Sequence, residues 1–225
     1  VYSQVLNSTD FTADENVEIT FDYTGIDRAW SDDRIVIGAK GDVQWGGIVL
    51  RLANTAAGTV AVTCVKEDMA TVLGTGGSAP LEANVLYHFR IVLNKAVGKM
   101  DVYITKNGKA VSSAPTLSVT DESIKVLSGG VAFGGWATEY TVDNLKIVAG
   151  DKLLLNADFS TMPQNLGHPD NPEAGTVTVI GGVLKLNGWN PAHSGGSVAI
   201  TKGLLGMNDL ADFDLSLEYT PADVQ

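Results

Sequence analysis

Apolar and polar residues alternate along most of this chain, and the alternation predicts β-strands. In the segment Asn16–Thr24 every second residue is apolar or aromatic, and the residues between them are polar or charged. A period of two puts one set on each face of a strand, so one face is buried and the other is solvated. Further strands are predicted at Arg34–Ala39, Gly47–Leu52, Thr59–Lys66, Leu86–Leu93, Lys99–Thr105, Gly130–Gly135, Thr141–Val148, Leu153–Ala157, Val183–Leu186 and Ser197–Thr201.

The connections between these segments are rich in Gly, Asn, Asp and Ser, and no segment shows a convincing helical period. Asn107-Gly108 predicts a type I′ hairpin turn, because these two residue types adopt the positive φ angles that the turn requires. Many short strands at this spacing indicate an all-β chain. The predicted architecture is a two-sheet antiparallel sandwich.

One predicted strand occurs twice in the sequence. The segment NVEITFDYT at Asn16–Thr24 returns as DFDLSLEYT at Asp212–Thr220, with conservative replacements along its whole length. The separation indicates a repeating unit of roughly 200 residues, which is the size of one large β domain. We therefore expect the chain to be part of a tandem array, with one nearly whole unit and the start of another.

Composition excludes several classes of protein. An apolar fraction of 44% is that of a globular chain, and the net charge of −11 with scattered cations offers no basic patch for nucleic acid. The single cysteine, Cys64, has no partner for an intrachain disulfide and is expected in the core. No apolar run is long enough to cross a membrane, so we expect no membrane insertion.

Four stretches of the sequence carry a family resemblance, namely Leu86–Val111, Gly129–Val148, Leu153–Pro163 and Gly181–Trp189. The first two look like the C-terminal half of concanavalin A-like jelly rolls of the laminin-G or laminarinase type. The last two resemble the beginning of such a domain. The resemblance implies a two-sheet antiparallel jelly roll and covers most of the chain.

The order of these stretches leaves the domain organisation open. Residues 1–150 are interpreted as a jelly-roll domain without its opening strands, because its closing strand precedes the opening-type strand that begins at Leu153. In one reading, residues 151–225 begin a following repeat. In the other, they turn back as a hairpin and complete residues 1–150, by permutation or by exchange between units.

The predicted hairpin suggests a structural Ca²⁺ site. With Gly150-Asp151 as its two-residue loop, Asp143 lies opposite Asp158, and two facing carboxylates repel each other unless a cation lies between them. Calcium prefers oxygen ligands, and Asn144 is a further candidate, with Asn156 and Glu139 nearby. The alternative is that both acids are solvated or accept hydrogen bonds from backbone amides.

Two tryptophan-containing segments are candidate glycan-binding loops, because sugars bind to flat aromatic rings flanked by polar side chains. The first comprises Trp189 with Asn187, Asn190 and His193, and the second comprises Trp30 with Asp32 and Arg34. The alternative for each tryptophan is packing under a loop at the edge of the sandwich.

A catalytic site is not expected. Glu18 and Asp22 share a strand face, but their spacing differs from that of laminarinase-like enzymes, and Glu218 replaces Asp22 in the second copy. A solvated strand face accounts for these acids.

The leading interpretation is a noncatalytic extracellular or cell-surface module, of bacterial type, that binds glycans or serves adhesion. An alternative is a structural stalk or filament unit that assembles with other copies of itself through strand exchange. A glycoside hydrolase of the laminarinase type is third. The resemblance contributes to this ordering, since fold alone does not fix function.

Overall fold

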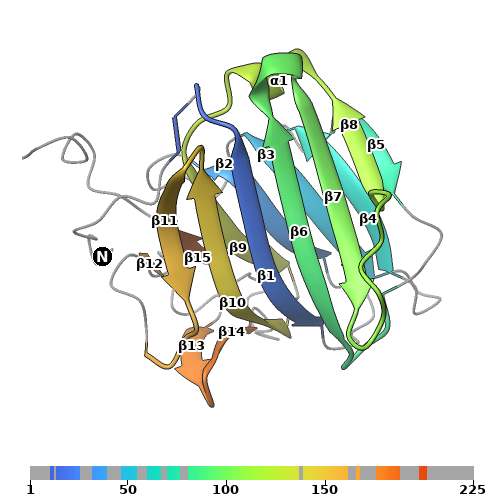
Figure 1. Cartoon of the computed structure of the whole chain (residues 1–225). Helices are drawn as coiled ribbons and strands as arrows, with labels where there is room; N and C mark the ends of the chain where they lie inside the picture. Colours follow the sequence, from blue (N-terminus) through green and yellow to red (C-terminus); the bar gives the residue numbers. More distant parts are fainter. Residues whose placement is uncertain are drawn as a thin grey trace, which may run out of the picture.

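The computed structural model describes residues 11–12, 14–25, 32–39, 47–54, 60–66, 70–76, 81–136, 139–161, 166–167, 176–187 and 198–201. Two antiparallel sheets lie face to face across these residues (Figure 1). The predicted all-β, two-sheet antiparallel sandwich is confirmed. Within the described part, no helix is both long and apolar enough to cross a membrane.

The larger sheet has eight strands within the described residues. In order across the sheet, seven of them are β13 (Thr176–Ile180), β14 (Val183–Asn187), β10 (Glu139–Ala149), β1 (Val17–Gly25), β6 (Leu86–Asn94), β7 (Lys99–Lys106) and β8 (Leu117–Thr120). The eighth, β11 (Lys152–Ala157), pairs with β10. Strand β1 therefore lies in the interior of the sheet, between β10 and β6.

The second sheet has seven strands in the part that the structure describes. Their order is β12 (Leu166–Gly167), β15 (Val198–Thr201), β9 (Gly130–Trp136), β2 (Asp32–Ala39), β3 (Ile48–Asn54), β4 (Val60–Lys66) and β5 (Val72–Gly76). The helical elements are two short segments, η1 (Lys95–Val97) and α1 (Glu122–Lys125). Both follow strands of the larger sheet, and α1 is capped by the side chain of Asp121, which accepts from the amide of Ser123.

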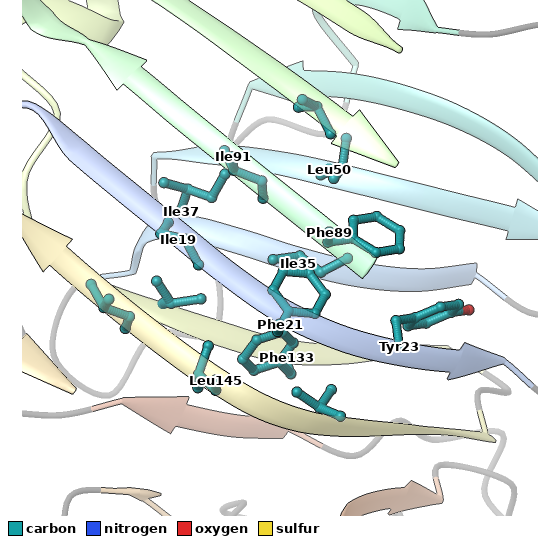
Figure 2. Close-up of a cluster of buried hydrophobic side chains, with 14 of the residues drawn as sticks. Ile19, Phe21, Tyr23, Ile35, Ile37, Leu50, Phe89, Ile91, Phe133 and Leu145 are labelled. Carbon is teal, nitrogen blue, oxygen red and sulfur yellow. The ribbon is translucent and has the colours of Figure 1, made fainter. Parts of the chain in front are cut away.

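The core lies between the two sheets and follows the alternation seen in the sequence. Along β1, Val17, Ile19, Phe21 and Tyr23 are buried, while the residues between them are partly exposed on the other face. Figure 2 shows inward side chains of both sheets meeting in one apolar layer. Burial of each such side chain stabilises the fold by about 1.5–3 kcal/mol.

Aromatic rings occupy the centre of this layer. Phe21 stacks on Phe89 with ring centroids 4.9 Å apart, and its ring meets that of Phe133 edge-on at 5.2 Å. Phe21 belongs to β1 and Phe133 to β9, so this contact joins the two sheets (Figure 2). Offset and edge-to-face aromatic pairs stabilise a core beyond the apolar area that they bury. Phe21 thus sets the distance between β1 and the second sheet.

Strands after residue 150 pair with strands before it. The predicted Gly150-Asp151 turn is present, and β11 follows it back along the C-terminal half of β10. Strand β14 pairs with the N-terminal half of β10, and β15 pairs with β9 in the second sheet. The described strands of both parts therefore share two sheets, whereas the tandem repeat and the division at residue 150 stay predictions. The second copy of the repeated strand lies outside the described residues.

The Asn107-Gly108 turn differs from its prediction. Lys109 donates its amide to the carbonyl of Lys106, so a turn forms, but only Gly108 has a positive φ angle, of 76°. A type I′ turn requires positive φ at both central residues, so that prediction is wrong. The chain continues as a loop to Thr116 before β8 begins, and this loop borders the open face of the larger sheet.

Candidate functional site

The outward face of β1 lies in the interior of the larger sheet and presents Thr20 and Asp22. Phe21 and Tyr23, which alternate with them along β1, are buried in the core. The alternation therefore directs the side chains of Thr20 and Asp22 outward. On β6, Arg90 lies opposite Thr20 and His88 lies opposite Asp22. Polar side chains of two adjacent strands therefore meet on the solvent-exposed face.

A β-bulge in β10 brings Asn144 to the same place. Thr20 pairs with Lys146, but Asp22 pairs with Asp143, so one extra residue is inserted on β10. Asn144 has a φ angle of 50°, a left-handed conformation that Asn adopts more readily than most residues. Its Nδ2 donates to Oδ2 of Asp22 at 2.8 Å. The bulge has redirected a side chain, as bulges near functional sites often do.

Asp22 is held from two sides. Oδ1 of Asp22 lies 2.5 Å from Nδ1 of His88, while Oδ2 accepts the hydrogen bond from Asn144. The other ring nitrogen of His88, Nε2, lies 3.4 Å from Oδ1 of Asn107. A carboxylate oxygen can accept more than one hydrogen bond, so Asp22 keeps acceptor capacity for a further donor. His88 and Asn144 therefore fix the orientation of the Asp22 carboxylate and leave it able to accept a further hydrogen bond.

An open hollow of about 260 Å³ surrounds this group. It is lined by Thr20, Phe21, Asp22, His88, Phe89, Arg90, Tyr103, Thr105, Val111 and Asn144. The residues come from β1, β6, β7 and β10 and from the loop after β7. The hollow therefore combines a carboxylate, an amide, the hydroxyls of two threonines, an imidazole and a guanidinium with the phenol ring of a tyrosine and the side chain of an exposed valine.

Arg90 forms the wall of the hollow towards β7. Its Nη2 donates to Oε2 of Glu18 at 2.8 Å, and its guanidinium carbon lies 5.2 Å from the centroid of the Tyr103 ring. The hydrogen bond that Arg90 donates to Glu18 raises the pKa of the Arg90 guanidinium, which stays charged. Stacking on the ring keeps the planar group close to the sheet.

The predicted calcium pair does not form. A second bulge, between Ile147 and Val148, shifts the register of the hairpin, and β10 and β11 pair no further than Leu145 with Ala157. Asp143 lies beyond the last of these pairs and is not paired with Asp158, and across the other edge of β10 it lies opposite Asp22 of β1. A loop of two residues was predicted correctly, but the register beyond it was wrong because an alternating pattern does not reveal a bulge.

Each acid of the proposed pair instead accepts a backbone hydrogen bond. Oδ1 of Asp143 accepts from the amide of Asn144 at 2.7 Å, and Oδ1 of Asp158 accepts from the amide of Ser160 at 3.0 Å. The hydrogen bonds from Ser160 hold the pKa of Asp158 below its usual value. Among the described residues, no three His, Cys, Asp or Glu side chains are grouped as metal ligands.

The remaining candidates for that site are dispersed. Asn144 lies beside Asp22, as described above, while Asn156 pairs across the sheet with Lys146. Glu139 is buried and forms an ion pair with Lys185 at 3.1 Å.

The described residues of the second tryptophan segment lie on the other sheet. Asp32 and Arg34 belong to β2, and the carboxylate of Asp32 accepts from Nη2 of Arg34 at 2.6 Å and from Nη2 of Arg51 at 2.8 Å. Both oxygens of Asp32 are engaged by guanidinium groups, so this pair forms a charge cluster and not an open binding group. Trp30 lies outside the described residues.

The first tryptophan segment is described at one residue only. Asn187 ends β14, is partly buried and lies opposite Glu139. Trp189, Asn190 and His193 lie outside the described residues. The expected binding role of this loop stays a prediction.

The sequence analysis assigned Asp22 to a solvated strand face and did not combine it with His88. The alternation placed Asp22 on the correct face, but the sequence did not show that β6 and β10 flank β1. The detectable signal was Asn144 within a predicted strand, since Asn is enriched at positive φ angles, which a regular strand does not contain.

Comparisons with known proteins assign no family to this chain. No protein-family model matches the chain, and no curated protein matches it. Among solved structures, a Lotus tetragonolobus seed lectin is 9% identical with a TM-score of 0.41, covering 62% of this chain and 73% of the lectin. A heptameric SAP-like pentraxin from Limulus polyphemus is 13% identical with a TM-score of 0.40, covering 68% of this chain and 70% of the pentraxin.

A third similar structure is Scytalido-glutamic peptidase, which is 8% identical with a TM-score of 0.40 and covers 82% of this chain and 96% of the peptidase. These likenesses concern the fold only. Function has to be inferred from the site itself.

Proposed function

We propose that the chain is a carbohydrate-binding module whose site is the hollow around Asp22. Sugars present hydroxyl groups that both donate and accept hydrogen bonds, together with apolar CH faces. Asp22 supplies an acceptor, Asn144 an amide and Thr20 a hydroxyl, while Tyr103 and Val111 supply apolar surface. The hollow is open, which suits a chain-like or terminal sugar approaching from solvent.

The observation that carries this proposal is the orientation of Asp22 by His88 and Asn144. These partners come from the two strands that flank β1, so the carboxylate is positioned before any ligand arrives. Preorganisation of this kind lowers the entropic cost of binding. Each bound sugar hydroxyl can then donate to an acceptor that is already in place.

The proposed site binds a glycan and does not catalyse a reaction on it. Both oxygens of Asp22 have partners, and Asp143 accepts a hydrogen bond from the backbone, which favours roles in holding a ligand over roles in proton transfer. In the sequence, the second copy of the strand carries Ser216 and Glu218 where the first has Thr20 and Asp22. The hydroxyl and the acid are kept, while the acid changes length, as a binding surface tolerates better than a catalytic pair. A repetitive extracellular or surface protein used for adhesion is the setting that we propose.

A glycan array followed by titration calorimetry tests the proposal. The intact chain is expected to bind at least one class of glycan, and Asp22→Asn is expected to weaken that binding by about tenfold, the equivalent of one good hydrogen bond. Asp151→Asn, the same change at the exposed turn between β10 and β11, is the matched control and should bind normally. Absence of binding across a broad array would contradict the proposal, as would equal affinity of the two variants.

A further inference from the structure

Two cations flank Thr20 on the open face, next to the hollow. The register of the sheet sets Lys146 of β10 on one side of Thr20 and Arg90 of β6 on the other. Side chains directly opposite one another in neighbouring antiparallel strands have Cβ atoms about 5 Å apart. A threonine with a lysine opposite it on one neighbouring strand and an arginine opposite it on the other is therefore a feature of the sheet itself and not of a loop.

Neither cation is committed to a buried partner. Lys146 is exposed, and no ion pair joins it to any other described residue. Arg90 pairs with Glu18, but these side chains are 46% and 44% exposed. An exposed pair of this kind contributes little, so Arg90 can exchange Glu18 for an anion of a ligand at small cost.

The row of the sheet at Thr20 carries two cations, while the carboxylates of Glu18 and Asp22 lie in the rows on either side of it. A net charge of −11 repels anions from most of the surface, so an anionic group gains only where cations are concentrated. Arg90 presents a planar fork of donors above the Tyr103 ring, which matches the two oxygens of a carboxylate. Lys146 adds a second charge, and the Thr20 hydroxyl adds a donor between them.

We infer that the bound glycan contains a uronic acid, whose carboxylate lies over Thr20 between Arg90 and Lys146 while its neighbouring hydroxyls reach Asp22 and Asn144. This inference rests on the proposed carbohydrate-binding function and names the substrate class. In this arrangement the carboxylate of the sugar lies over Thr20 and faces Arg90 and Lys146. The carboxylate of Asp22 faces His88 and Asn144.

The test uses an array of matched oligosaccharide pairs that differ only in whether C6 carries a hydroxyl or a carboxylate. For the intact chain, the carboxylate member of the bound pair is expected to bind about tenfold more tightly, and added salt is expected to reduce this advantage. Lys146→Gln, which lies outside the lining of the hollow, should remove most of the advantage and leave binding of the neutral member unaffected. Arg90→Gln should also remove most of the advantage, and because Arg90 lines the hollow its variant is read only from the ratio of the two affinities. Lys125→Gln, at an exposed ion pair on helix α1, is the control for loss of one positive charge and should retain the advantage.

The outcomes separate the two proposals. If neutral and acidic members bind equally and the Arg90 and Lys146 variants behave like the control, the uronic acid inference is overturned. The carbohydrate-binding function stands in that case, provided that Asp22→Asn still weakens binding. If no member of any pair binds, both proposals fail. Unchanged melting temperatures of the variants would show that any loss arises at the site.

Discussion

At the scale of single residues, a buried phenol and a buried carboxylate form a pair that the sequence did not indicate. The hydroxyl of Tyr23 donates to Oδ2 of Asp33 at 2.5 Å, between the two sheets. Burial, together with the negative charge of Asp33, raises the pKa of Tyr23 well above its usual value, so the phenol remains a donor at any physiological pH. Tyr140, beside it, donates to the carbonyl of Gly134 at 3.1 Å.

Replacing Tyr23 and Tyr140 by phenylalanine compares the loss of a hydrogen bond to a charged acceptor with the loss of one to a neutral acceptor. Tyr23→Phe is expected to lower the free energy of unfolding by about 2 kcal/mol, because a buried carboxylate loses a donor. Tyr140→Phe removes a hydrogen bond to a neutral carbonyl and is expected to cost about 1 kcal/mol. Urea unfolding of both variants measures the difference. Equal losses would show that Asp33 does not depend on Tyr23.

Side chains whose environment follows from their own strand could be predicted, and Asp33 could not. Cys64 is fully buried, as the apolar run around it indicated, and burial raises the pKa of its thiol to about 12. Asp32 and Asp33 are consecutive, so alternation puts one of them inward, but an inward carboxylate is expected only once its partner is known. That partner belongs to β1, and only the packing of the two sheets brings it near.

At the scale of elements, the bulge in β10 decides what the open face can do. Within the described residues, each predicted strand coincides with a strand of the structure to within a few residues, because burial imposes the period of two. Bulges preserve that period on either side and change the register between strands. The alternation therefore predicted the strand at Thr141–Val148 but not that Asn144 would contact Asp22.

Two substitutions at Asn144 distinguish the effect of its backbone conformation on stability from the effect of its side-chain amide on binding. Asn144→Gly removes the amide that donates to Asp22 but suits the φ angle of 50°, so glycan affinity should fall about tenfold with little loss of stability. Asn144→Ala removes the same amide and also strains the backbone, at a cost of about 1 kcal/mol. Calorimetry and thermal melting measure the two effects. Equal stability of both variants would contradict the role of the bulge.

At the scale of the whole molecule, the strands after residue 150 complete both the larger sheet and the core. Phe159, Leu184 and Leu186 are buried in the same apolar cluster as the residues of β1. Neighbouring strands that are far apart in sequence leave no mark in a local pattern, so the sequence left two readings of this tail. The short strands β5 and β8 were missed for a related reason, since each has few alternating positions and depends on the sheet for its conformation.

Removal of residues 151–225 tests how far the first part depends on the tail. The fragment would expose the edge of β10 that β11 and β14 cover and would lose several buried side chains, each worth about 1.5–3 kcal/mol. Against a typical total of about 5–15 kcal/mol, the fragment is expected to unfold or aggregate. Circular dichroism and thermal melting measure this. A cooperative melt at the temperature of the intact chain would instead support an independent domain at residues 1–150.

The central claim is that glycan binds at the hollow around Asp22. The most direct test is an amide NMR titration of the intact chain with the glycan that the array identifies. We predict that the largest shifts fall on the residues around Asp22 and His88, on β1 and β6, and on the bulge at Asn144. Shifts concentrated instead at Asn187 and the segment that follows it, or at Asp32 and Arg34 on the opposite sheet, would contradict the account.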